Sequence, residues 1–182
     1  LEQILTHEIG ASEKANICAL LGAVYLLVGN NEQGTQRLVE ALAVAPNHAE
    51  AWKNLSEGLR RLDRLDEAVE ASRKVLTLKP DYVEAHNNIG NLLYEQGKFD
   101  DAIASYCKAL MLKPNYAEAH HNMGMVLKDQ GMLDDAIVSY RKALSLKPNF
   151  PEAHNSMGGT LRKLGKLDEA EESYRQAIKL KG

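Results

Sequence analysis

The amino-acid sequence predicts an all-α protein built from repeated helical hairpins, and two observations lead to this class. Ala, Leu, Glu and Lys are abundant, whereas aromatic residues make up only 5% of the chain, a composition that favours helices over strands. Prolines also recur at intervals of 34 residues, and the apolar residues between them follow helical spacing on two segments. The recurring prolines are Pro46, Pro80, Pro114 and Pro148.

The proline spacing divides the chain into five units. They cover residues 15–48, 49–82, 83–116, 117–150 and 151–182, and residues 1–14 are expected to be the end of a preceding partial unit. Each unit is predicted to form one hairpin, with its first helix near 15–28, 49–62, 83–96, 117–130 or 151–164. A residue in the left-handed conformation is expected to end each first helix. The residues at this position are Gly29, Asp63, Gly97, Gly131 and Gly165.

A second pattern indicates where each first helix begins. An Asn or Asp follows each proline, and a Glu comes three residues later, as with Asn115 and Glu118. This spacing predicts a capping box, in which the two side chains bond the first backbone N–H groups of the helix. The repeated glutamates therefore have a local explanation and need not form an acidic stripe. They are Glu50, Glu84, Glu118 and Glu152.

The residues within each unit resemble the tetratricopeptide pattern W-x2-L-G-x2-Y…A-x3-F…P, whose period is also 34 residues. In the fourth unit the matching residues are His120, Met123, Gly124, Leu127, Ala136, Tyr140, Ala143 and Pro148. The chain is similar to the tetratricopeptide repeat (TPR) family over nearly its whole length, although Ser56 replaces a glycine and Gly34 an alanine of the pattern. The resemblance implies a right-handed α-solenoid of five hairpins, in which the first helices line a concave groove.

Composition excludes several classes of function. The formal charge is −3 and both signs are interleaved, so nucleic acid is not expected as a partner. The longest apolar run, residues 17–28, is too short to cross a bilayer. Cys18 and Cys107 lack metal-ligand spacing, and both are expected to be buried thiols in a reducing, cytoplasmic compartment. Since no catalytic or phosphate-binding motif is present, we expect neither enzymatic activity nor a cofactor.

Histidines that recur with the period suggest a metal site, but their spacing argues against one. His86, His120 and His154 lie on neighbouring first helices, which should be roughly 8–10 Å apart. Ligands of one zinc ion each lie about 2 Å from the metal. These histidines occupy the tryptophan position of the family pattern, so a packing role is expected. His121 is about 100° further around its helix and is expected to face the groove as a contact residue.

The strongest candidate for binding is a row of asparagines at the sixth position of successive first helices: Asn54, Asn88 and Asn122. An asparagine amide both donates and accepts, so it can bond the backbone of an extended peptide without reading its side chains. The row is similar to the asparagines that line the TPR array of O-linked N-acetylglucosamine transferases. Leu20 and Ser156 interrupt it at the two ends. The alternative is that these asparagines are tolerated polar residues on an exposed helix face.

Other residues of the first helices complete the predicted groove, which carries both charges. The predicted contacts besides the three asparagines are Lys53, Asn87, His121, Asn91, Tyr94, Arg60 and Lys128. A carboxylate clamp of the TPR type is not expected, because Glu84 and Asn88 lack the required basic groups. In the first unit the equivalent surface is apolar, and an amphipathic helix or the upstream residues could cover it. Its residues are Leu20, Ala23, Leu26 and Leu27.

Three functions remain open from the sequence. The first is a non-catalytic module that binds an extended peptide or a partner domain in its groove. The second is a substrate-recruiting region of a larger transferase, similar to that of the O-linked N-acetylglucosamine transferases. The third is a scaffold that self-associates through an uncapped C-terminal face, where Leu167, Tyr174 and Ile178 are expected to be exposed.

Overall fold

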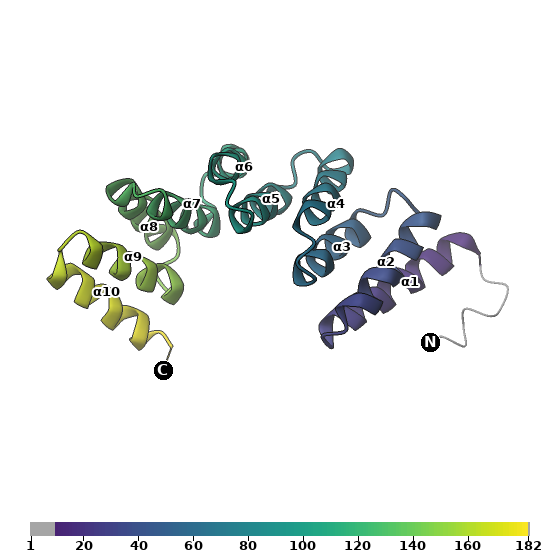
Figure 1. The fold of residues 1–182 in the computed structure, drawn as a ribbon, viewed down its shortest axis with the longest axis horizontal. Helices are drawn as coiled ribbons and strands as arrows, with labels where there is room; N and C mark the ends of the chain where they lie inside the picture. The colour runs from purple at the N-terminus through teal and green to yellow at the C-terminus, as the bar shows by residue number, and fades with distance from the viewer. Residues whose placement is uncertain (1–9, 182) are drawn as a thin grey trace. The chain divides into compact units, whose positions relative to one another are not determined.

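The computed structural model describes residues 10–181, and within this range the chain forms ten helices and no strand (Figure 1). The predicted all-α class is therefore confirmed. The helices are α1 (Ala11–Leu27), α2 (Asn31–Val44), α3 (Ala49–Arg61), α4 (Leu65–Leu78), α5 (Val83–Glu95), α6 (Phe99–Leu112), α7 (Ala117–Asp129), α8 (Leu133–Leu146), α9 (Pro151–Lys163) and α10 (Leu167–Lys179).

The helices group into two compact units. Unit 1 contains α1 to α4, and unit 2 contains α6 to α10 together with α5 from His86 onward. Within each unit the two helices of a hairpin pack on each other, as α1 does on α2 and α7 on α8. The second helix of one hairpin then packs on the first helix of the next, as α2 does on α3 and α8 on α9. One apolar core therefore continues from hairpin to hairpin within each unit.

Four of the five predicted first helices begin at the predicted residue and end one residue early. The exception is α1, which begins at Ala11, so residues 11–14 belong to this helix rather than to a preceding repeat. The remainder of that predicted segment, residues 1–9, lies outside the described residues. A residue with positive φ ends each first helix, as predicted. Asp63, with φ of 57°, does so where the other units have glycine.

Close contact between a glycine and an aromatic ring holds the helices of a hairpin together. A Cβ atom added at Gly90 would lie 2.4 Å from Cε1 of Tyr106, and one at Gly124 would lie 2.7 Å from the equivalent atom of Tyr140. In the second hairpin both positions are serine. There Ser56 Oγ donates or accepts a hydrogen bond with Ser72 Oγ at 2.7 Å. A hydroxyl pair thus replaces the glycine–tyrosine contact.

The predicted capping boxes are wrong, because the first helices begin one residue later than that motif requires. The residues that precede α3, α7 and α9 are His48, Tyr116 and Phe150, so the Asn of the motif lies outside the helix. His48 Nδ1 accepts from the backbone N–H of Ala51 at 3.2 Å. Glu118 accepts from Lys147 Nζ at 2.8 Å.

Candidate functional site

Ring nitrogens at the tryptophan position of the repeat bond the preceding proline carbonyl. Trp52 Nε1 donates to the carbonyl of Pro46 at 2.7 Å. The Nε2 atoms of His120 and His154 lie 3.0 Å from the carbonyl oxygens of the prolines six residues before them. Histidine thus replaces the indole N–H, and these two rings, for which packing was expected, form a hydrogen bond at the start of their helix. Among residues 10–181, no group of three or more His, Cys, Asp or Glu side chains is placed to hold a metal ion.

In unit 2 a polar network joins α5, α6 and α7. Asn122 Nδ2 donates to Asn87 Oδ1 at 3.1 Å and to Asn91 Oδ1 at 2.9 Å. The hydroxyl of Tyr106 also donates to Asn91 Oδ1, at 2.8 Å. Asn87 is buried, whereas Asn88 is exposed on the same helix. The network brings three of the predicted contact residues together and fixes the orientation of the Asn122 amide.

The same register recurs one hairpin later. His121 and Ser156 lie one repeat after Asn87 and Asn122, and His121 Nε2 lies 3.2 Å from Ser156 Oγ. We call the contact between the first helices of two successive hairpins a joint. In both joints, α5 with α7 and α7 with α9, the fifth residue of one first helix bonds the sixth residue of the next. Ser156, which interrupts the row of asparagines in the sequence, keeps the hydrogen-bonded contact. We call the side chains of Asn88, Asn122 and Ser156 on α5, α7 and α9 the rung face of unit 2.

The structure corrects the expectation that His121 is an accessible contact residue. Its side chain is 7% exposed, because the fifth position of α7 faces the following hairpin. Its ring centroid lies 4.9 Å from that of Phe150 and 5.7 Å from that of Tyr140. Burial holds the pKa of His121 below its usual value, although a hydrogen bond with Asn122 and the charge of Glu152 act in the opposite direction.

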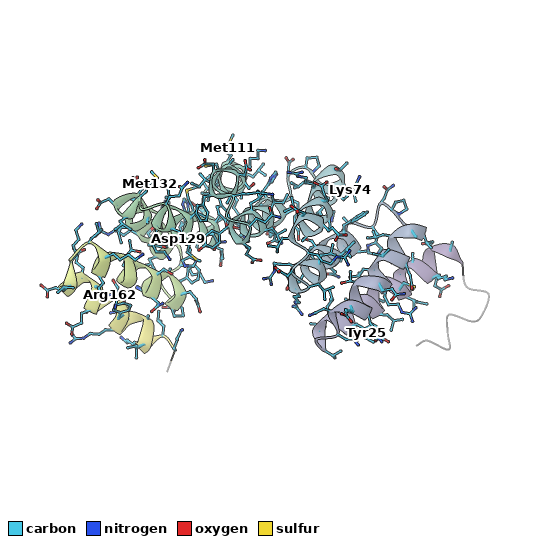
Figure 2. All side chains as sticks on the ribbon, viewed as in Figure 1. Tyr25, Lys74, Met111, Asp129, Met132 and Arg162 are labelled. Atoms are coloured by element: carbon cyan, nitrogen blue, oxygen red, sulfur yellow. The ribbon has the colours of Figure 1, made fainter. Side chains whose placement is uncertain are left out.

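A second group of polar contacts lies at the C-terminal ends of the first helices in unit 2. The hydroxyl of Tyr94 on α5 donates to Asp129 Oδ2 on α7 at 2.5 Å, and Lys128 Nζ lies 3.2 Å from Asp129 Oδ1. Burial and the Asp129 carboxylate raise the pKa of Tyr94 to about 12. Figure 2 labels Asp129, which ends α7, and Met111 of α6, which is exposed. Asp129 was not predicted as a site residue, although Tyr94 and Lys128 were.

In unit 1 the predicted contact residues lie on α3. Asn54 is half-buried there, Lys53 pairs with Glu50, and Arg60 pairs with Glu57 at 3.0 Å. The pair of Lys53 and Glu50 joins residues three apart on one helix, and an isolated exposed pair of this kind contributes little to stability. Glu57 accepts from Arg60 through two nitrogens and also from Arg61.

The apolar surface predicted on the first helix is present, with one correction. Leu27 is 82% exposed, and Leu20, Val24 and Val28 are exposed beside it. Leu26, which was expected on this surface, is 5% exposed. Leu26 packs against Gly34, which has no side chain. A Cβ atom added at Gly34 would lie only 2.8 Å from Leu26 Cδ2, so the glycine makes room for the leucine.

The two cysteines differ, contrary to prediction. Cys18 is buried and Cys107 is exposed on α6. The repeat carried a signal for this exposure, because the equivalent positions in other units are Arg73, Arg141 and Arg175. In a separate test of the described residues, no helix is both long enough and apolar enough to pass through a membrane.

Stacked helical hairpins whose first helices present polar side chains define an α-solenoid scaffold for protein interaction. Family models agree with this class. The model described as TPR repeat matches residues 59–97 and 90–131, and the model described as tetratricopeptide repeat matches residues 117–150 and 151–182. The chain belongs to the TPR family and is a protein-interaction module.

Solved structures show the same fold. The chain is similar to pilF of Pseudomonas aeruginosa, with a TM-score of 0.82 and 27% identity over 96% of this chain and 79% of that one. It is similar to MamA, with a TM-score of 0.78 and 26% identity over 92% of each chain. MamA from Desulfovibrio magneticus RS-1 gives a TM-score of 0.80 at 22% identity, over 92% of this chain and 95% of that one. A search of curated proteins found no match.

Proposed function

We propose that this chain is a non-catalytic module that binds an extended peptide or a partner domain along the first helices of its units. The observation that carries the proposal is the rung face of unit 2. There, α5 presents the exposed Asn88, and α7 presents Asn122 with its amide fixed by Asn87 and Asn91. A fixed amide loses little side-chain entropy when it bonds a ligand, which favours binding.

The spacing of the helices suits a peptide backbone. First helices in contact lie roughly 8–10 Å apart, and an extended peptide rises about 3.3 Å per residue. Neighbouring rungs would thus meet about every third residue of a bound strand. The exposed amide of Asn88 can bond a backbone N–H and C=O together, whereas both N–H donors of Asn122 are used within the chain and only its Oδ1 is left to accept from a ligand. Contacts to backbone groups select for extended conformation more than for sequence. In unit 1, we propose that Lys53 and Arg60 of α3 supply charged contacts to a ligand.

A recruiting region of a larger transferase is the alternative that the asparagines support, through their similarity to those of the O-linked N-acetylglucosamine transferases. It predicts many polypeptide partners bound through backbone contacts. A dedicated module predicts one partner or a few. Capture from the source lysate separates these two functions. It counts the distinct proteins that the chain retains and shows which of them are lost when the asparagines are mutated.

Self-association is a second candidate function. Leu167 and Ile178 on α10 are 64% and 71% exposed, which favours contact with another copy. Glu171 opposes it, because this residue takes the position that the buried Ile137 occupies in α8. Burying a carboxylate without a partner is unfavourable. We expect light scattering to detect pairing at high concentration that Leu167→Glu with Ile178→Glu abolishes. A mass that does not change with concentration would exclude this function.

Capture from the source lysate tests the main proposal. The parent chain is compared with a variant in which Asn54, Asn88 and Asn122 are alanine, and the melting temperature of each protein is measured as well, because Asn122 also belongs to an internal network. The matched control carries alanine at Asn47, Asn115 and Asn149, which are exposed in the connections between hairpins. We expect the control to retain the partner and the rung variant to lose it. Equal retention by both variants would show that the asparagine row does not bind.

A further inference from the structure

One joint of unit 2 contains a buried titratable side chain. His121 of α7 touches Tyr140 of α8 and Phe150, which directly precedes α9, and its Nε2 lies 3.2 Å from Ser156 Oγ of α9. The ring is therefore enclosed by groups from the helices on both sides of the joint. A charge that appears on the ring would have to be accommodated where little water is present.

The preceding joint of the same unit has no titratable group at the corresponding place. Its pair is Asn87 and Asn122, which bond through their amides at 3.1 Å. The two joints thus share one register but differ in chemistry. A change in proton concentration acts directly on the pair formed by His121 and Ser156 and leaves the asparagine pair as it is.

The charged groups around His121 oppose one another. On α7, Glu118 favours the protonated ring and Lys128 disfavours it, and on α9 Glu152 favours it. On α8 the facing group is Tyr140, whose pKa burial raises, so it stays neutral. Burial of His121 outweighs the two glutamates, and the pKa of the imidazole is lowered.

We propose that protonation of His121 loosens the joint between α7 and α9 and makes the rung face of unit 2 sensitive to acid. The effect on binding rests on the proposed function, whereas the loosening of the joint does not. Asn122 follows His121 directly and shares a hydrogen bond with it, so movement of the ring disturbs a rung. Ser156 is the ring's partner across the joint and is itself a rung.

The sign of the effect follows from linkage. The neutral ring is favoured in the folded chain, so the unfolded chain takes up the proton more readily. The stability from this site is complete above about pH 6.5, the ordinary pKa of histidine, and is lost as the pH falls through the lower pKa of the folded state. One proton changes the folding equilibrium constant by at most about tenfold per pH unit.

The test uses the chain's own asparagine pair as its model. Urea unfolding is measured from pH 7.5 to 5.0 for the parent and for the double variant His121→Asn with Ser156→Asn, which reproduces the pair at Asn87 and Asn122. His120→Gln is the matched control, because it removes the neighbouring histidine outside the joint. We expect the parent and the control to lose more stability in acid than the double variant. An equal loss in the double variant would overturn the proposal.

Two further measurements apply if the double variant does not fold. They distinguish the loosening of the joint from its effect on peptide binding. In the parent, the NMR titration of the His121 ring should have its midpoint below pH 6.5, and a midpoint at or above this value would refute the proposal. A peptide selected from a displayed library at pH 7.5 should lose more affinity at pH 5.0 for the parent than for His121→Asn alone. If no peptide is selected, the peptide-binding form of the proposed function fails, and the titration still tests the proposal for the joint.

Discussion

At the scale of single residues, the structure assigns different tasks to side chains of the same type. Asn87 is buried and accepts a hydrogen bond, Asn88 beside it is exposed, and Asn122 donates into a network. The sequence shows three asparagines at the right period but does not show which of them have amides already bonded within the protein. That distinction depends on the fifth residue of the neighbouring helix. It was therefore not predictable from spacing alone.

Gly90 provides a direct test of packing at this scale. Gly90→Ala places a Cβ atom against the buried ring of Tyr106, whose hydroxyl is fixed by Asn91. Overpacking of this kind typically costs about 1–3 kcal/mol, and urea unfolding should show it as a lower midpoint. Gly159→Ala is the control, because its Cβ atom would lie 3.5 Å from the Tyr174 hydroxyl, an ordinary contact. A loss as large for the control would mean that the cost is not caused by the ring.

At the scale of helices and hairpins, most of the fold was predictable. The period of 34 residues fixes the number of hairpins, and the residues with positive φ fix where the first helices end. Helix starts were predictable only in position and not in mechanism. His48 caps α3 through its side chain, whereas Tyr116 and Phe150 precede α7 and α9 without a side-chain capping bond, and the conspicuous asparagines lie outside the helices. The burial of His121 was missed because it depends on how one hairpin packs on the next.

Asp63 tests the helix ends. This aspartate has a φ of 57°, and the glycines at the equivalent positions have positive φ of 73–83°, which glycine adopts without steric cost. Asp63→Gly should therefore stabilise the chain by roughly 1 kcal/mol. Gly97→Asp, the converse change in unit 2, should destabilise it by a similar amount. Thermal unfolding of both variants measures this, and a lower melting temperature for Asp63→Gly would contradict the account of how these helices end.

At the scale of the whole molecule, the chain joins two compact units with different surfaces on their first helices. In unit 1 an exposed apolar surface around Leu27 lies on α1, and ion pairs such as that of Arg60 lie on α3. Unit 2 presents the rung face, held by hydrogen bonds from one helix to the next. The family fixes the architecture and the general role in protein interaction. In the proposed function, the side chains on the first helices decide what is bound.

Asn88 gives the most direct test of the central claim, that these asparagines bind a peptide backbone. Asn122→Ala would break an internal network and confuse binding with stability, whereas Asn88 is exposed and its loss should change stability by less than about 0.5 kcal/mol. The measurement is the dissociation constant of a library-selected peptide for the parent, for Asn88→Ala and for the exposed control Asn115→Ala. Loss of one hydrogen bond should weaken binding roughly two- to tenfold for Asn88→Ala and leave the control unchanged. Equal affinities for all three proteins, at equal melting temperatures, would contradict the account.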